Sequence, residues 1–251
     1  MAGVALVTGA NKGIGFAIAN GLGRLGYTVL VGARDPQRGD AAVRALRFGS
    51  PAQSPPSRPS IDVELIVIDI SDVSSVERAA TALERRYGVL DVLVNNAAVK
   101  LEFHPSPPST VPLSIVRSTF EVNVFGTIAV TQRMLPLLRR SPGARIVNMS
   151  SGLGSLELAT TEGTKYRERP LLSYNVSKAA LNSVTVQFAN ELRSTAIKVN
   201  AADPGFTNTD MTNRTGDRSA EVAAQIAIRL ATLPADGPTG GFFDDNGPLP
   251  W

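Results

Sequence analysis

Short apolar runs alternate with helix-like stretches along almost the whole of this 251-residue chain, and this alternation limits the possible folds more than any other feature. The apolar runs, interpreted as strands, cover residues 4–8, 28–33, 62–69, 90–95, 145–150 and 197–202, with a short seventh at 241–243. The helices between them cover residues 13–25, 37–47, 73–87, 116–139, 174–193 and 220–233, with Pro136 as a candidate bend. Nearly continuous apolar strands are typical of parallel sheets covered by helices on both faces. The pattern therefore predicts an α/β fold, a single Rossmann-type doubly wound parallel sheet of about seven strands.

Two proline-rich segments interrupt the pattern. Residues 49–60 hold four Pro and four Ser, and we expect a surface loop there because proline continues neither a helix nor a strand. Residues 105–112 also hold four Pro and follow the fourth strand, at the sheet edge where α/β proteins bind ligands. That segment either only joins strand to helix or also touches substrate. No linker divides the chain, so residues 1–251 are expected to form one domain.

Composition excludes several classes of function. The chain has 25 Lys and Arg against 22 Asp and Glu, a net charge of +3, and its basic residues occur singly or in pairs. Nucleic-acid binders and membrane-surface binders usually carry longer basic runs. With no Cys and one His (His104), disulfides, thiol nucleophiles, and cysteine or multi-histidine metal sites are excluded, and no metal site is expected. No basic leader and no apolar span of about 20 residues is apparent, so a cytoplasmic location is expected.

Residues 8–15 read TGANKGIG and place three glycines where the first strand meets the first helix. Glycine lets the backbone approach a pyrophosphate closely, and the helix N-terminus offers free N–H groups and a positive dipole end. A lone glycine cluster is weak evidence and can be a plain tight turn. Its position between strand and helix favours a dinucleotide site.

The end of the second strand indicates which dinucleotide is preferred. NAD sites place an acidic residue about 20 residues after the glycines, but here Ala33 stands at that position and Arg34 follows. A guanidinium can grip a 2′-phosphate, and Lys12 in the glycine loop could add a second charge. NADP(H) is therefore favoured over NAD(H). The alternative is that Arg34 is only a solvated charge at the end of the strand. Asp35 is interpreted as an exposed turn residue.

Tyr174 and Lys178 are spaced i, i+4 on an expected helix and so share one face. A nearby cation favours the phenolate and is expected to lower the pKa of Tyr174. In a chain with one His, Tyr174 is the candidate acid or base. Ser150 and Ser151 end the fifth strand and present hydroxyls at the same sheet edge.

Together these motifs resemble the short-chain dehydrogenase/reductase family over nearly the whole chain. In the family's order they are TGANKGIG at 8–15, Asp69-Ile70, Asn95-Asn96-Ala97-Ala98, Asn123, Ser150-Ser151, Tyr174 to Lys178 and Pro204-Gly205. The usual glycine of the third motif is Ala98 here, a small departure from which we expect no loss of activity.

The resemblance implies the catalytic roles. Tyr174 resembles the general acid that protonates the carbonyl oxygen, and Ser151 the hydroxyl that holds this oxygen, with Ser150 as the alternative. Lys178 resembles the lysine that binds the nicotinamide ribose and keeps Tyr174 acidic. Asn123 resembles the asparagine that anchors a water in the proton relay.

The resemblance also implies which residues contact the cofactor. The expected positions frame the adenine, border the ribose and line the nicotinamide side of a bound NADP(H). They are Gly9, Asn11, Lys12, Gly13, Ile14, Gly15, Arg34, Asp69, Ile70, Asn95, Ala97, Tyr174, Lys178, Pro204, Gly205, Thr207 and Thr209.

The glycine loop, GARD at 32–35 and GPTGGFF at 237–243 are similar to the NADPH-dependent carbonyl reductase branch. This similarity implies reduction of a ketone or aldehyde to an alcohol, with a small-molecule carbonyl substrate and no nucleic-acid or membrane partner. The polar stretch 156–169 would border the substrate mouth, and its intermediate length leaves monomer or homo-oligomer undecided. The alternatives are a secondary-alcohol dehydrogenase, a 3-oxoacyl-type reductase, and a non-catalytic NADP-binding regulator, against which the intact set of Ser151, Tyr174 and Lys178 argues.

Overall fold

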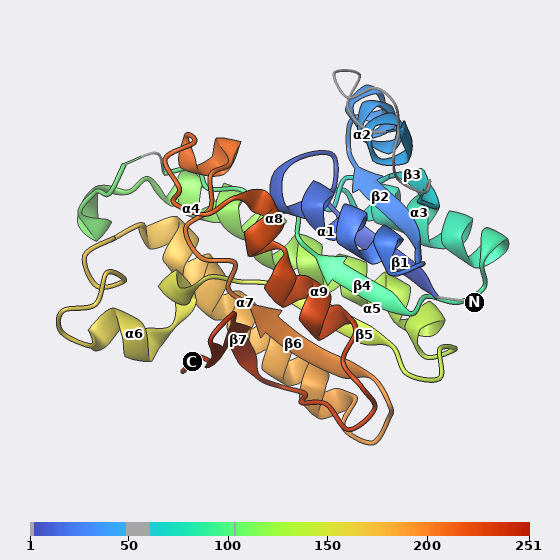
Figure 1. Cartoon of the computed structure of the whole chain (residues 1–251). Coiled ribbons are helices and arrows are strands. Elements are labelled where there is room, and N and C mark those ends of the chain that lie inside the picture. The colour runs from blue at the N-terminus through green and yellow to red at the C-terminus, as the bar shows by residue number, and fades with distance from the viewer. Residues whose placement is uncertain (1–2, 49–60, 103) are drawn as a thin grey trace.

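The computed structural model describes residues 3–48, 61–102 and 104–251, and within them an eight-stranded sheet forms the centre of the molecule (Figure 1). The strand order is β3-β2-β1-β4-β5-β6-β7-β8, with every neighbouring pair parallel except β7 and β8. The predicted Rossmann-type sheet is confirmed, and an antiparallel β8 is added at its edge. The strands are β1 Val4–Thr8, β2 Thr28–Ala33, β3 Val63–Val67, β4 Val92–Asn95, β5 Arg145–Met149, β6 Lys198–Ala202, β7 Phe242–Asp244 and β8 Gly247–Pro248.

Helices cover both faces of the sheet, as the apolar strands require. Alternate residues of one strand serve opposite cores: Ala5 and Val7 of β1 belong to one buried cluster and Leu6 to the other. The first cluster lies under α1 Gly13–Arg24, α2 Pro36–Phe48 and α9 Gln225–Ala231. The second lies under α3 Val73–Arg86, α5 Thr127–Leu138 and α7 Leu172–Glu191.

The order of the strands reverses at β1, which pairs with β2 on one side and with β4 on the other. The connections that leave β1 and β4 at their carboxyl ends therefore run to opposite faces of the sheet and part from one another. A crevice opens at such a point, and α/β proteins bind ligands there. The glycine loop after β1 and the motifs after β4, β5 and β6 all reach this edge.

The expected helix over residues 116–139 is longer and less regular than predicted. It runs without a break from α4 Leu113–Phe120 through the π-helical segment η2 Glu121–Gly126 into α5, and Pro136 lies inside α5. The stretch Leu113–Leu138 is long enough to span a membrane and contains an 18-residue window with a mean hydropathy of 1.2, which the sequence analysis did not anticipate. Here its last part packs on α3 and on the sheet beside α7.

Other departures are local. The expected helix at 220–233 is interrupted at Ala224 and forms α8 Ala220–Ala223 and α9. The proline-rich residues 105–112 form an exposed loop around η1 Pro108–Thr110. The segment after β5 forms η3 Gly152–Gly154, and the polar stretch 156–169 begins with α6 Leu156–Thr160. Another short helix, η4 Asp210–Thr212, lies between β6 and α8. The expected surface loop at 49–60 lies outside the described residues.

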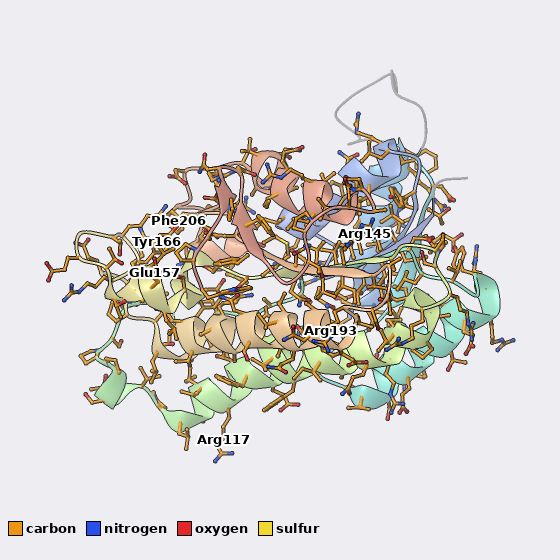
Figure 2. The ribbon with its side chains drawn as sticks, turned by 90° about the horizontal axis from the view of Figure 1, so that it is seen from below. Arg117, Arg145, Glu157, Tyr166, Arg193 and Phe206 are labelled. Atoms are coloured by element: carbon orange, nitrogen blue, oxygen red, sulfur yellow. The ribbon has the colours of Figure 1, made fainter. Side chains whose placement is uncertain are left out.

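A buried arginine joins the segments at the opposite, amino edge of the sheet. Arg145, 7% exposed at the start of β5, donates to the carbonyl oxygens of Gly143 (2.7 Å), Ala144 and Ala196 through Nη1. Its Nε and Nη2 reach the carbonyls of Leu233 and Pro234 at 2.7–3.0 Å. Figure 2 shows Arg145 well away from Tyr166 and Phe206, which mark the other end of the molecule. This guanidinium therefore ties three connections together far from the crevice.

Candidate active site

The loop between β1 and α1 has a shape that only glycine permits. Gly13 begins α1 with φ +58°, in the left-handed region that other residues adopt rarely. A methyl group on Gly15 would overlap the carbonyl oxygen of Gly9 and the side-chain nitrogen of Asn96. The backbone of the loop is therefore packed tightly against the end of β4 and leaves its outer side open.

The N-terminus of α1 has no side-chain cap. Lys12 occupies the N-cap position in extended conformation, and its side chain makes no capping hydrogen bond. The first backbone N–H groups of the helix, at Gly13, Ile14 and Gly15, lie at the wall of a cavity. Free N–H groups at the positive end of a helix dipole favour an anion, and phosphate is the usual one.

That cavity has a volume of about 480 Å³ and runs along the carboxyl edge of the sheet. It brings together most of the positions expected from the sequence, from the glycine loop to Tyr174 and Lys178. Those that line it are Gly9, Asn11, Lys12, Gly13, Ile14, Gly15, Arg34, Asp69, Ile70, Ala97, Tyr174, Lys178, Pro204 and Thr209. The predicted site residues that do not line it are Asn95, Asn123, Ser151, Gly205 and Thr207, whereas Ser150, the alternative to Ser151, does. The proline-rich loop at 105–112 does not line it either.

Asn95, the last residue of β4, and Asn96, which follows it, face in different directions. The side chain of Asn95 is buried on the face toward α5 and α7, where Nδ2 donates to Thr131 Oγ1 (3.1 Å) and Asn148 Oδ1 (2.8 Å). Asn96 lines the cavity and donates to the carbonyl oxygens of Thr8 and Gly9. The sequence analysis placed Asn95 by the ribose and did not assign Asn96, which holds the glycine loop against β4.

The two charged residues after β2, Arg34 and Asp35, make different contacts. Arg34 is exposed and lines the cavity. The Asp35 carboxylate accepts from the backbone N–H groups of Gln37 (2.9 Å) and Arg38 (3.2 Å) at the start of α2. Asp35 therefore caps the N-terminus of α2, and Arg34 is the charged residue of this pair that lines the cavity.

Lys12 already has a partner within the chain. Its Nζ donates to Asp210 Oδ2 at 2.7 Å, and Arg214 donates to the other oxygen of the same carboxylate at 2.8 Å. The hydrogen bond and charge of Lys12, and to a smaller extent those of Arg214, hold the pKa of Asp210 below its usual value. Arg214 also lines the cavity and is a cation that the sequence analysis missed.

The contacts distinguish the two serines after β5. Ser150 Oγ is buried and hydrogen-bonded to Asn182 Oδ1 of α7, toward the interior. Ser151 is the N-cap residue of η3, where its Oγ accepts from the backbone N–H of Leu153 at 3.3 Å, and this hydroxyl is close enough to Tyr174 to oppose the rise in the pKa of the phenol. Of the two hydroxyls, that of Ser151 is therefore the one beside the phenol of Tyr174.

Tyr174 and Lys178 lie together on α7, with Lys178 Nζ 5.5 Å from the centroid of the Tyr174 ring. Lys178 is buried and donates to the carbonyl oxygen of Met149 at 2.7 Å, and burial lowers its pKa to about 8. Burial first, and then the charge of Asp203, raise the pKa of Tyr174 above its usual value. The lowering expected from the lysine is therefore wrong for the chain alone, because desolvation of the phenolate and the charge of Asp203 outweigh the opposing effect of Ser151.

Asp203, directly before Pro204, is a buried acid that the sequence analysis did not single out. It is 4% exposed, and one of its oxygens accepts from the backbone N–H of Gly205 at 3.0 Å. Burial raises the pKa of this carboxyl, while the backbone N–H groups of Gly205 and Gly152 oppose the rise. Asp203 acts on both Tyr174 and Lys178 through its charge, and a buried acid among apolar strand residues was the available signal.

Asn123 lies in the middle of η2 and joins the loop after β4 to α7. Its Oδ1 accepts from Val99 N–H (2.8 Å), and its Nδ2 donates to Val99 O (2.9 Å) and to Ser177 Oγ (3.0 Å). Single π turns inside α-helices occur frequently at functional sites. The side chain of Asn123 therefore fixes a segment of the cavity wall next to Tyr174.

The N-terminus of α7 is held by a distant acid. Leu171 at the N-cap position offers no capping side chain, and the buried Glu102 accepts from both the N–H and the hydroxyl of Ser173. Because Ser173 directly precedes Tyr174, Glu102 fixes the turn that carries the phenol. No helix-capping pattern marks Glu102, since it lies 71 positions upstream of Ser173.

The polar stretch before α7 closes over η3. The ring of Tyr166 lies against Gly152, where a methyl group would overlap it, and burial followed by the charges of Asp203 and Asp244 raises the pKa of Tyr166 to about 12. The guanidinium of Arg169 lies 4.5 Å from the ring centroid of Phe206, on the loop after β6. Figure 2 shows Tyr166 and Phe206 at the same end of the molecule.

Comparison with known proteins gives a consistent result. Residues 3–220 match the short chain dehydrogenase family. The chain is 37% identical over 232 residues to short-chain dehydrogenase anuI of Penicillium roqueforti, covering 90% of this chain and 87% of that protein. It is 32% identical to carbonyl reductase (NADPH) 1 of Sus scrofa, covering 99% and 94%. The structure of NADPH-bound carbonyl reductase from chicken fatty liver superposes with a TM-score of 0.82 at 26% identity, covering 99% and 98%.

Proposed function

We propose that this chain, which belongs to the short-chain dehydrogenase/reductase family and resembles its carbonyl reductases, reduces a ketone or aldehyde to an alcohol with NADPH. The observation that carries the proposal is the pairing of Tyr174 with Lys178 in a cavity that begins at the glycine loop, with the Ser151 hydroxyl close enough to act on the phenol. A phenol and a buried ammonium at one end of the cavity, with a hydroxyl beside the phenol, suit proton transfer to a carbonyl oxygen.

The residues present fit a dinucleotide with a 2′-phosphate. The loop offers free N–H groups and no side chain that would block a pyrophosphate. Arg34 is the exposed cation at the end of β2, and Asp35 is engaged by α2, so no free carboxylate opposes a phosphate there. The pig and chicken relatives carry NADPH in their names, which agrees with this choice.

The chain's own groups would divide the chemistry as follows. When bound, the cofactor supplies the hydride. Tyr174 donates its phenolic proton to the substrate oxygen, and its raised pKa keeps the phenol protonated for that step at neutral pH. Ser151 donates a hydrogen bond that orients the same oxygen. Lys178, with its pKa of about 8, remains largely cationic at pH 7, binds the ribose and stabilises the phenolate left behind.

The test is the loss of NADPH absorbance with a panel of ketones, aldehydes and quinones, repeated with NADH. Tyr174→Phe should reduce turnover by about 10²–10⁴-fold, the usual contribution of a general acid, and should leave NADPH affinity within a few fold. A variant that turns over like wild type would overturn the mechanism. A wild type that binds NADPH and reduces nothing in the panel would favour the non-catalytic regulator.

Arg34→Ala separates the cofactor proposal from the activity. If Arg34 holds the 2′-phosphate, the variant should lose affinity for NADPH by about tenfold or more and change little toward NADH. An equal effect on both cofactors would reject Arg34 as the phosphate ligand while leaving the reductase in place.

A further inference from the structure

Two cations lie in segments that are hydrogen-bonded to the residues on either side of Tyr174, and neither has a role in the chemistry described above. Lys100 belongs to the segment after β4, and Arg169 to the stretch before α7. We propose that Lys100 and Arg169 together bind a carboxylate on the substrate, so that the preferred substrate is a carbonyl compound that carries an acid group. This inference rests on the proposed reductase function and names the substrate class of that site.

Hydrogen bonds hold both of these segments next to the turn that carries Tyr174. Lys100 stands between Val99, which lines the cavity and is held by Asn123, and the segment ending at Glu102, which is bonded to Ser173. The carbonyl oxygen of Arg169 accepts from Asn175 Nδ2 at 3.0 Å. Ser173 and Asn175 flank Tyr174, so both cations are attached to the turn that presents the phenol.

The side chains of these two residues form a pair of like charges. Arg169 is near enough to Lys100 to contribute, after burial, to lowering the lysine pKa, and Lys100 is partly buried. Among the described residues neither cation makes an ion pair within 4.0 Å. Two neighbouring cations without an acidic partner repel one another, and an anion between them relieves that repulsion.

Glu102 is the acid whose charge acts on Lys100, and it is hydrogen-bonded to Ser173. One of its oxygens accepts two hydrogen bonds from Ser173, and the other has no hydrogen-bond partner among the described residues. Its charge raises the pKa of Lys100, against the effects of burial and of Arg169.

The position of Arg169 suits a carboxylate in particular. Its guanidinium lies 4.5 Å from the ring centroid of Phe206, a stacking contact that restrains the plane of the donors. A restrained guanidinium binds a planar carboxylate through two parallel hydrogen bonds, and Lys100 adds a point charge. Phe206 follows Pro204-Gly205, so the same contact joins the carboxylate site to the wall of the cavity.

The experiment compares 4-formylbenzoate with methyl 4-formylbenzoate as substrates of the NADPH-loaded enzyme. Wild type should prefer the acid by about tenfold or more in kcat/KM, the effect expected of one hydrogen-bonded charge pair. Arg169→Met and Lys100→Met should each reduce the ratio of acid to ester. Arg193→Met is the matched control, because it removes one exposed positive charge just beyond the far end of α7 (Figure 2) and should leave the ratio unchanged.

The outcomes keep the two proposals apart. If wild type reduces the ester as well as the acid, the carboxylate site is wrong. It is also wrong if the preference for the acid persists in both Arg169→Met and Lys100→Met. Neither result contradicts the reductase proposal. If neither aldehyde is reduced, an NMR titration with benzoate decides. Binding weakened in Arg169→Met and unchanged in Arg193→Met supports the site, and equal binding by all three proteins overturns it. Failure of the reductase proposal appears separately, as loss of turnover over the whole substrate panel.

Discussion

Lys178 is a buried cation, and replacing it should change how the stability of the protein depends on pH. The side chain is 2% exposed, and its pKa falls from 10.5 to about 8. Between these two values the unfolded chain holds a proton at this position and the folded chain does not. The free energy of unfolding must therefore rise with pH across that window, and Lys178→Met should remove this part of the rise.

The size of the effect follows from the two pKa values. At pH 7 the buried ammonium opposes folding by about 3 kcal/mol, and at pH 9.5 by about 1.4 kcal/mol. Losing the hydrogen bond to Met149 O shifts the stability of Lys178→Met by a similar amount at both pH values. Relative to wild type, the variant should therefore be more stable at pH 7 than at pH 9.5 by about 2 kcal/mol.

The assay is urea unfolding of both proteins at pH 7 and pH 9.5, followed by circular dichroism. Groups other than Lys178 titrate in both proteins and cancel in the difference. A difference between the proteins that does not change with pH would show that Lys178 keeps an ordinary pKa in the folded chain. The electrostatic account of the site would then be rejected.

Three further predictions concern the loop, the serines and the amino edge of the sheet. Gly15→Ala should weaken NADPH binding by about tenfold or more, because the new methyl group displaces the loop; an unchanged dissociation constant in a fluorescence titration would contradict this. Ser151→Ala should lower kcat by about 10²–10³-fold, whereas Ser150→Ala should mainly lower stability, by about 1–2 kcal/mol, because its hydroxyl faces Asn182; the reverse order in steady-state kinetics would exchange their roles. Arg145→Met should lower the free energy of unfolding by about 2–4 kcal/mol with little change in KM, because it removes a guanidinium that joins several carbonyl oxygens; unfolding and kinetics measured on one preparation test both parts.

The sheet and the ends of the cavity were predictable because their signals are local. The apolar runs predicted β1, β2 and β5 closely, and TGANKGIG predicted a tight loop that opens a helix. Tyr174 and Lys178 were expected on one helix face because an i, i+4 spacing has a single geometric meaning. In each case neighbouring residues in the sequence determine the structure.

The remaining features depend on contacts between distant segments. The direction of Asn95 depends on the register of β4 against its neighbours, and Asn148 and Thr131 come from other elements. Glu102 reaches Ser173 only once β4 and α7 are packed together. The pKa of Tyr174 depends on burial, which the spacing of Tyr174 and Lys178 does not reveal. The π turn at Asn123 carries no compositional signal in the sequence.

The ion pair between Lys12 and Asp210 has a consequence for how ionic strength acts on cofactor affinity. The two residues are 198 positions apart, both line the cavity, and both are well exposed. If Lys12 turns to a bound phosphate, one ion pair is exchanged for another, and added salt screens both of them. Affinity for NADPH should then fall less steeply with salt concentration than two phosphate-binding cations would imply, with Arg34 accounting for most of the remaining slope.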